Sequence, residues 1–372
     1  MAEPVTLESP RARVALDPAC GHLARLALGA GGAAVEPLYR APWADRADAL
    51  DPALPPVLRH LSGDFFCAPF GACDVEEGPA HGPAANAPWR LLAREESGED
   101  RRLDLACTRT ILGARIEKTL RLRGDDPVLY QDHRLVGGDG AVPVAHHAMI
   151  RAAGGCRLST SPKRLVATPP EPLEPDPAVG TSILAYPQSV PGLDSLALAD
   201  GSTVDARRFP FAEGHDDLAM MVEADLDGLG WTAAACVAGG FLVFTVKPAA
   251  VLPATVLWLS NRGRTYAPFD ESPGPVLGIE DACTFFHLGH RASAGDNALT
   301  AEGVPTALAL APGGARSVRF AIGAVTIDAR WSGEVRLTIG RGRLDIEDAG
   351  GPAVTIPFDT DWFTVKEAAG HG

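Results

Sequence analysis

The sequence predicts an all-β protein with large antiparallel sheets and few short helices. Apolar and polar residues alternate with a period of two, as in half-buried strands, at 13–16, 102–105, 116–122, 232–237, 241–246, 317–322 and 334–339. Turn sequences bound these segments, for example at 124–127 and 312–314. The 40 glycines and 32 prolines are spread along the chain, as expected for many short elements joined by turns.

Helical signals are few. The best window, residues 45–61, contains Pro52, Pro55 and Pro56, and proline interrupts a helix interior. Residues 168–191 are too rich in proline to sustain a strand ladder and too apolar for a simple linker, so we expect an ordered excursion at the rim of a cleft. We predict one continuous β domain over 1–362 and a disordered tail over 363–372.

Charge excludes several classes of partner. The formal net charge is -14 at pH 7 and the sequence pI is about 5.1, so the chain lacks the basic face that nucleic acid or an anionic membrane requires. We therefore expect a neutral or cationic small-molecule ligand. The first residues contain no apolar signal segment, and no stretch approaches the roughly 20 apolar residues of a spanning helix, which predicts a cytoplasmic protein.

The cysteines predict neither a disulfide framework nor a metal site. Seven cysteines are scattered along the chain without a CxxC pair, at Cys20, Cys67, Cys73, Cys107, Cys156, Cys236 and Cys283. We interpret them as reduced, mostly buried thiols. The sequence also contains no ligand cluster and no glycine-rich phosphate loop, so it predicts neither a metal nor an organic cofactor.

The first concentration of candidate site residues spans 62–71 and 81–89. It contains Asp64, and it contains His81 beside Gly82, where the backbone can be approached closely. Trp89 offers a flat apolar face of the kind that stacks on a sugar ring. The alternative is a turn histidine and a core tryptophan without a binding role.

The second concentration is the pair His146 and His147 in the apolar segment 142–150. Neighbouring residues of a strand point to opposite faces of the sheet, so only one of these imidazoles can face a given cleft. The sequence leaves open which one does. A hydrogen-bonded structural histidine is the alternative for either position.

Carboxylates mark the remaining two places. Asp216 and Asp217 follow His215 at the start of an apolar segment, where turn or cap chemistry is the alternative to binding. Glu280 precedes Asp281 within the apolar run 276–286. Burial of such a carboxylate is costly and can lift its pKa toward the range of a general base, which makes Glu280 the strongest catalytic candidate.

Taken in order, these four places resemble the aldose 1-epimerase (galactose mutarotase-like) superfamily. The resemblance consists of a His-Gly with a downstream Trp, a strand His, an Asp before an apolar strand and a Glu within one, followed by the turn at 312–313. It extends over residues 14–322. The sequence Pro-Phe-Gly at 69–71, together with Asn86 and Trp89 after the His-Gly, is most similar to the hexose-6-phosphate mutarotase branch.

This resemblance implies a β-supersandwich and an isomerase that interconverts sugar anomers without a cofactor. Glu280 would be the base, with His147 or His146 and His81 as acids. Asp216 or Asp217 would hold a sugar hydroxyl. Asp64, Asn86 and Trp89 would line the same site. The implied partner is a small-molecule sugar, bound by a monomer or a homodimer.

The chain departs from the family pattern at positions that affect the substrate. Phe70 and Gly71 replace an Asn-Arg pair of galactose mutarotases, and Ala85 replaces an arginine of the sugar-phosphate members. We therefore expect phosphorylated sugars to bind no better than their neutral parents. If they do bind better, the candidate phosphate partners are Arg151, Arg262 and Arg264.

Two further departures lie beside the catalytic candidates, where Asp281 and Ala148 replace prolines. They leave two other functions open on the same scaffold. One is a non-catalytic sugar-binding or sensor protein, because a fold does not determine a function. The other is an epimerase or lyase of modified sugars or uronates.

Overall fold

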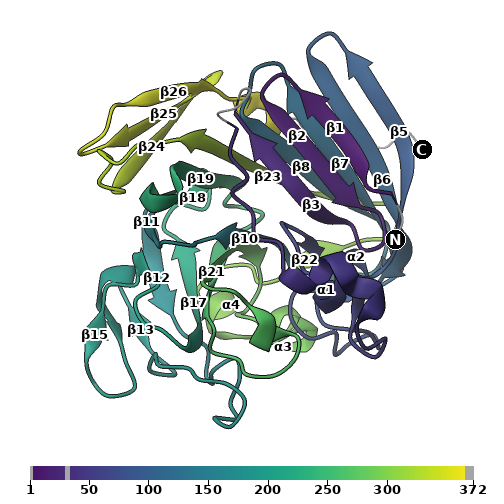
Figure 1. Ribbon diagram of the computed structural model, residues 1–372. Helices are drawn as coiled ribbons and strands as arrows, with labels where there is room; N and C mark the ends of the chain where they lie inside the picture. The colour runs from purple at the N-terminus through teal and green to yellow at the C-terminus, as the bar shows by residue number, and fades with distance from the viewer. Residues whose placement is uncertain (1–2, 30–33, 365–372) are drawn as a thin grey trace.

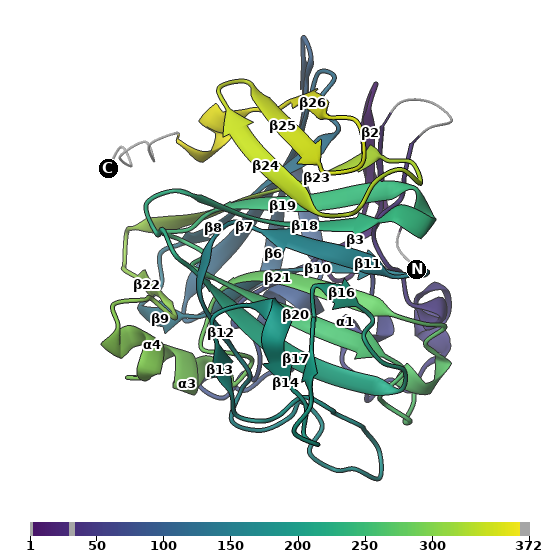
Figure 2. The same ribbon diagram turned by 90° about the vertical axis from the view of Figure 1, so that its left-hand side faces the viewer.

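The computed structural model describes residues 3–29 and 34–364, and two large antiparallel sheets dominate it (Figure 1). Figure 2 shows these sheets as stacked layers, with a small C-terminal sheet above them. The predicted all-β class with large antiparallel sheets and few short helices is confirmed. Among the described residues, no helix has the length and apolar character needed to cross a membrane.

A seven-stranded sheet carries most of the candidate residues. In spatial order its strands are β13 (Ser189–Val190), β12 (Lys163–Ala167), β17 (His215–Glu223), β20 (Ala254–Asn261), β21 (Val276–Cys283), β10 (Val144–Arg151) and β4 (Phe66–Cys67). Every residue of β17, β20 and β21 is buried. Both faces of this sheet are therefore covered, which explains why its central strands read as continuous apolar runs with isolated polar residues.

A nine-stranded sheet packs against one face of the first. Its order is β16 (Arg208–Phe209), β11 (Cys156–Thr160), β18 (Leu229–Cys236), β19 (Phe241–Pro248), β23 (Ala315–Thr326), β8 (Val128–Val136), β7 (Ala114–Arg123), β6 (Asp100–Ile111) and β5 (Trp89–Ser97). Strand β7 alternates buried and partly exposed residues, as its period-two sequence predicts.

Smaller sheets complete the layers. They comprise β1 (Val5–Ser9), β2 (Ala12–Asp17) and β3 (His22–Leu28); β24 (Val335–Gly340), β25 (Arg343–Asp348) and β26 (Val354–Pro357); β14 (Leu196–Ala197) with β15 (Thr203–Val204); and β9 (Gly140–Val142) with β22 (Leu308–Leu310). In Figure 1, β1–β3 lie across β6–β8. In Figure 2, β24–β26 cover the outer side of β19 and β23.

The helices are short, as the sequence predicts. They are η2 (Pro42–Ala49), α1 (Pro56–Arg59), α2 (Gly82–Asn86), η3 (Leu193–Ser195), η4 (Val237–Gly239), η5 (Phe269–Glu271), α3 (His290–Ala294), α4 (Ala298–Ala301) and η6 (Thr360–Phe363). The window at 45–61 is divided between η2 and α1, and Pro56 occupies the first turn of α1, where its missing N–H costs nothing.

Three apolar clusters hold the layers together. The largest fills the space between the sheets and beneath β1–β3, and includes Leu16, Leu120, Leu257 and Phe320. A second joins β24–β26 to the outer face of the nine-stranded sheet. The third lies on the far face of the seven-stranded sheet, under η2 and α1. This third cluster surrounds the candidate site.

Two further predictions concern the cysteines and the chain end. All seven cysteines are free thiols and five of them are buried, as expected. The predicted disordered tail at 363–372 is wrong at its first residue, because Phe363 ends η6 and stacks on Phe358 with ring centroids 6.0 Å apart. Residues 365–372 of that tail lie outside the described residues.

Candidate functional site

A pocket of about 300 Å³ opens on the face of the seven-stranded sheet that points away from the nine-stranded sheet. Most of its lining is apolar and includes Leu58, Leu61, Phe65, Phe70, Leu218, Trp258 and Phe269. Its ionisable side chains are His81, His147, Arg264, Glu280 and His287. A mostly apolar cavity with a few convergent polar groups is the usual form of a small-molecule site.

Strand pairing brings His147 and Glu280 together. Strands β10 and β21 are antiparallel neighbours, and the two residues are partners in the register. His147 Nε2 lies 3.1 Å from Glu280 Oε1. The register also pairs His146 with Asp281, which alternation places on the opposite face of the sheet. The structure thus brings His147, and not His146, to the pocket.

Burial controls the protonation of this pair. The loss of solvent raises the pKa of Glu280 well above its ordinary value, and the positive charge of Arg264 opposes part of that rise. Burial likewise lowers the pKa of His147 well below its ordinary value. The dry pocket therefore favours the neutral form of both groups, and the 3.1 Å contact allows one proton to pass between them.

His81 enters the pocket from a tight turn. Its backbone is left-handed, with φ of 67°, and the next residue, Gly82, also has positive φ. A Cβ atom at Gly82 would lie 2.0 Å from the carbonyl oxygen of Ala68, so this position requires glycine. The His81 ring stands edge-on to His147 with centroids 5.5 Å apart. A left-handed histidine is uncommon, and such conformations concentrate at functional sites.

Asn86 supports this turn from outside the pocket. Its side-chain amide donates to the carbonyl oxygens of Ala80 and Gly82 at 2.9 and 2.8 Å, and its oxygen accepts from the N–H of Val57 at 3.0 Å. These bonds use both N–H donors of the amide and one lone pair of its oxygen. The structure therefore gives Asn86 a positioning role for the His81 turn and does not place it against a ligand.

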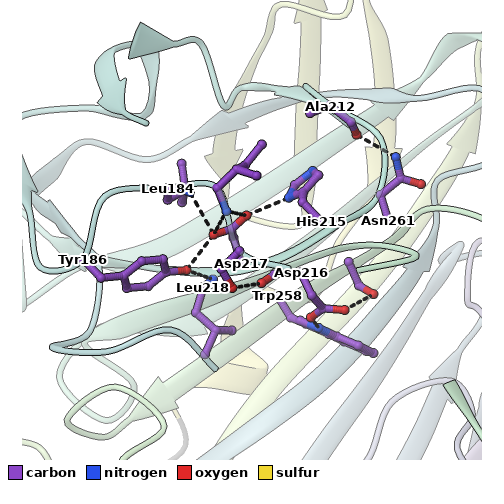
Figure 3. A network of polar contacts seen from close by, with 12 residues as sticks. Leu184, Tyr186, Ala212, His215, Asp216, Asp217, Leu218, Trp258 and Asn261 are labelled. Atoms are coloured by element: carbon purple, nitrogen blue, oxygen red, sulfur yellow. Dashed lines mark hydrogen bonds and ion pairs between the residues drawn. The ribbon is translucent and has the colours of Figure 1, made fainter. Parts of the chain in front are cut away.

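The two aspartates of β17 point to opposite faces (Figure 3). Asp216 lies on the pocket side, behind the lining residues, where its carboxylate accepts from Trp258 Nε1 at 2.6 Å and Ser260 Oγ at 2.8 Å. Arg264 Nη2 is a third donor at 3.2 Å. Asp216 thus holds two residues of the pocket wall in place.

Asp217 anchors the proline-rich excursion. It accepts from the backbone N–H of Leu184 at 3.1 Å, from the Tyr186 hydroxyl at 2.9 Å and from His215 Nδ1 at 2.8 Å (Figure 3). These bonds tie residues 183–186 to the start of β17, and Leu173 of the same excursion lines the pocket. The excursion thus contributes Leu173 to the pocket, whereas the Asp217 side chain itself does not reach it.

His146, Asp64 and Trp89 lie in the core between the sheets and not in the pocket. His146 stacks on Phe320 of the nine-stranded sheet with centroids 4.0 Å apart, and its Nδ1 lies 3.2 Å from Asp64 Oδ2. Trp89 is 4% exposed and donates to the carbonyl oxygen of Ala84 at 3.0 Å. Each of the three makes a polar contact inside the fold, which agrees with the structural alternative for His146 and for Trp89.

Two further residues of the pocket, Arg264 and His287, are absent from the site predicted by sequence. Arg264 follows β20, and its guanidinium lies 4.3 Å from the centre of the Phe269 ring and 5.5 Å from that of Trp258. His287 follows β21, and its buried Nδ1 has no hydrogen-bond partner in the described part of the chain. Neither residue belongs to a periodic segment, so no sequence pattern marks them as site residues. From sequence, Arg264 is only one of three alternative partners for a phosphate.

The buried pocket histidines predict a stability that depends on pH. Burial lowers the pKa of His81 and of His287 to about 4, whereas an unfolded histidine titrates near about 6.5. Between these values the unfolded chain binds more protons than the folded one, so stability is complete above about pH 6.5 and is lost as the pH falls toward 4.

Thermal melts between pH 7.5 and 4.5 check this expectation, and the midpoint should fall across that range. His287→Gln removes one of the titrating groups and should make the midpoint less sensitive to pH. A wild-type midpoint that stays constant from pH 7 to 4.5 would contradict the buried neutral imidazoles.

Comparison with known proteins identifies the fold. No family model and no curated protein sequence matches the chain. Solved structures do match: a protein of Synechocystis sp. PCC 6803 (15% identity, 88% of this chain and 96% of the other, TM-score 0.55) and a galactose mutarotase-like protein of Clostridium acetobutylicum (11% identity, 87% and 95%, TM-score 0.53). A galactose mutarotase related enzyme of Lactobacillus acidophilus matches with 13% identity, over 87% and 98%, at a TM-score of 0.50.

These similarities establish the class of fold. The chain has the β-sandwich of galactose mutarotase-like proteins, as the resemblance in its sequence implies. At 11 to 15% identity the neighbours indicate the architecture alone. The chemistry of the pocket must therefore be argued from its own residues.

Proposed function

We propose that this protein interconverts the anomers of an aldose by acid/base opening and closing of the sugar ring. The observation that supports this most strongly is the His147–Glu280 pair, with an N to O distance of 3.1 Å, at the wall of a pocket that would accommodate a sugar ring. A carboxylate and an imidazole with shifted pKa values, side by side in a cavity, are suited to proton transfer near neutral pH.

In the proposed reaction, Glu280 accepts the proton of the anomeric hydroxyl while the bond between C1 and the ring oxygen breaks. The ring oxygen takes a proton from an imidazole, His147 or His81, and C1 becomes the aldehyde carbon. Rotation about the C1–C2 bond presents the other face of the aldehyde, and the two proton transfers then run in reverse. Burial favours the neutral forms of Glu280 and His147, so the reactive state is the one in which a proton has passed from Glu280 to His147 across the 3.1 Å contact. That transfer leaves a carboxylate base beside the imidazolium that this step requires.

The composition of the pocket wall also supports a sugar ligand. His81, His147, His287, Arg264 and Glu280 line the pocket among mostly apolar side chains. A sugar ring has both apolar C–H faces and hydroxyl groups, so a mostly apolar wall with a few polar groups suits it.

A non-catalytic sugar-binding or sensor protein is the second candidate. One observation favours it: the Asp216 carboxylate is already occupied by Trp258, Ser260 and Arg264, and is not free to hold a sugar hydroxyl. An epimerase or lyase of modified sugars would use the same base on a carbon-bound proton.

Saturation-transfer NMR separates these functions. The rate of exchange between α and β anomers would be measured with and without the protein, for neutral, acidic and phosphorylated aldoses. We expect acceleration for at least one aldose. A sugar that binds without any acceleration would favour the sensor, and the appearance of an epimer or of an unsaturated product would favour the third function.

A further inference from the structure

We propose that the sugar bound in this pocket carries a carboxylate and that Arg264 binds it. This inference rests on the proposed sugar-binding function and specifies the class of substrate. The acidic composition of the whole chain favours a neutral or cationic ligand, but the local charge of the pocket differs from that average.

Among the described residues that line the pocket, Arg264 is the only lysine or arginine. The other ionisable lining groups are imidazoles and a carboxyl, and burial favours the neutral form of His81, His147, His287 and Glu280. The guanidinium keeps its charge under all ordinary conditions. It is therefore the group in this cavity best suited to bind an anion.

The guanidinium is fixed before any ligand arrives. Asp216 holds Nη2 at 3.2 Å, and Asp216 is itself held by Trp258 and Ser260. The plane of the guanidinium group lies near the Phe269 ring, with 4.3 Å between Cζ and the ring centroid, and the side chain is only 11% exposed. A preorganised donor loses little conformational entropy when it binds.

The guanidinium keeps donors for a ligand. Its hydrogen bond to Asp216 uses Nη2, whereas a guanidinium carries five N–H donors. The apolar wall of the pocket would strengthen a charge-assisted bond from these donors to a ligand oxygen by excluding water.

The pocket fits a carboxylate better than a hydroxyl or a phosphate. A carboxylate offers two oxygens to the planar guanidinium, whereas a hydroxyl offers one weaker acceptor. A phosphate dianion needs more positive charge, and the described lining provides no second lysine or arginine while Asp216 already offsets part of the Arg264 charge. We therefore expect uronates to bind better than either neutral or phosphorylated sugars.

Titration calorimetry with galacturonate and glucuronate, against galactose, glucose and glucose 6-phosphate, tests this inference. We expect wild-type protein to bind a uronate about ten- to a hundredfold more tightly than its neutral parent. Arg264→Met should abolish this preference, and Arg264→Lys should keep part of it. The matched control is Arg262→Met, because Arg262 is exposed, donates to the Pro273 carbonyl oxygen and does not line the pocket.

Equal affinity for a uronate and its neutral parent would overturn the inference, as would tighter binding of the phosphate or a preference that survives in Arg264→Met. If Arg264→Met fails to fold, the Arg264→Lys and Arg264→Gln variants decide, since a preference for uronate that survives in the uncharged Arg264→Gln would also overturn it. A uronate preference without anomer exchange supports this inference and contradicts only the proposed enzyme. Anomer exchange of neutral aldoses without any uronate preference supports the proposed enzyme and contradicts this inference.

Discussion

Glu280→Gln is expected to lower the rate constant for anomer exchange by about two to four orders of magnitude, the usual contribution of a positioned general base. Glutamine keeps the shape of the side chain and can still hydrogen-bond to His147, but it cannot accept the proton of the anomeric hydroxyl. Sugar affinity should change little, so the loss should appear in kcat and not in Kd. Saturation-transfer NMR gives the rate, and calorimetry gives the affinity.

The stability of the same variant provides a control. Burial raises the pKa of Glu280, so its ionised form costs free energy in the folded state at neutral pH. Glutamine removes that cost, and the thermal midpoint of Glu280→Gln should equal or exceed that of the wild type. A variant that is folded and fully active would exclude Glu280 as the base.

The sequence could predict the strands that carry the site but not which residues of each strand face it. Period-two alternation shows that His146 and His147 point apart, as do Asp216 and Asp217. The choice between them depends on which face of the seven-stranded sheet meets the nine-stranded sheet. That contact is visible only in three dimensions, where Phe320 stacks on His146.

Residues in irregular segments and at strand ends are harder to place from sequence, because no alternation shows which way they point. Arg264 and His287 follow strands in irregular segments, where residue type carries no periodic information. Trp89 and Asp64 have side chains that suit a sugar, an aromatic ring and a carboxylate, but both are buried in the core. Their burial reflects the way β4 and β5 pack into the fold, and local sequence does not encode that packing.

Substitution of Asp281, the residue next to Glu280, should lower the stability of the fold and not the rate of anomer exchange. Asp281 points into the space between the sheets, where its carboxylate lies 2.9 Å from Lys247 Nζ and accepts from Thr255 at 2.6 Å. Burial would raise the pKa of Asp281, but the charge of Lys247 and the hydrogen bonds bring it below its ordinary value. We expect Asp281→Asn to lower the free energy of unfolding by about 3–5 kcal/mol, because it leaves a buried ammonium without its closest counter-charge.

Chemical denaturation measures this loss, and a double variant tests its cause. Lys247 is fully buried, so its ammonium group cannot reach solvent when Asp281 is neutralised. Its second acidic neighbour, Glu223, lies farther away, at 3.4 Å. Asp281→Asn combined with Lys247→Met removes both charges, and it should recover most of the stability that the single change loses. The folded fraction of either variant should exchange anomers within a few-fold of the wild-type rate, since the pair lies on the opposite face of the sheet from Glu280. If Asp281→Asn alone unfolds at the same denaturant concentration as the wild type, Asp281 and Lys247 do not form a charged pair. The expected difference in stability between the Glu280 and Asp281 variants would then have no electrostatic cause.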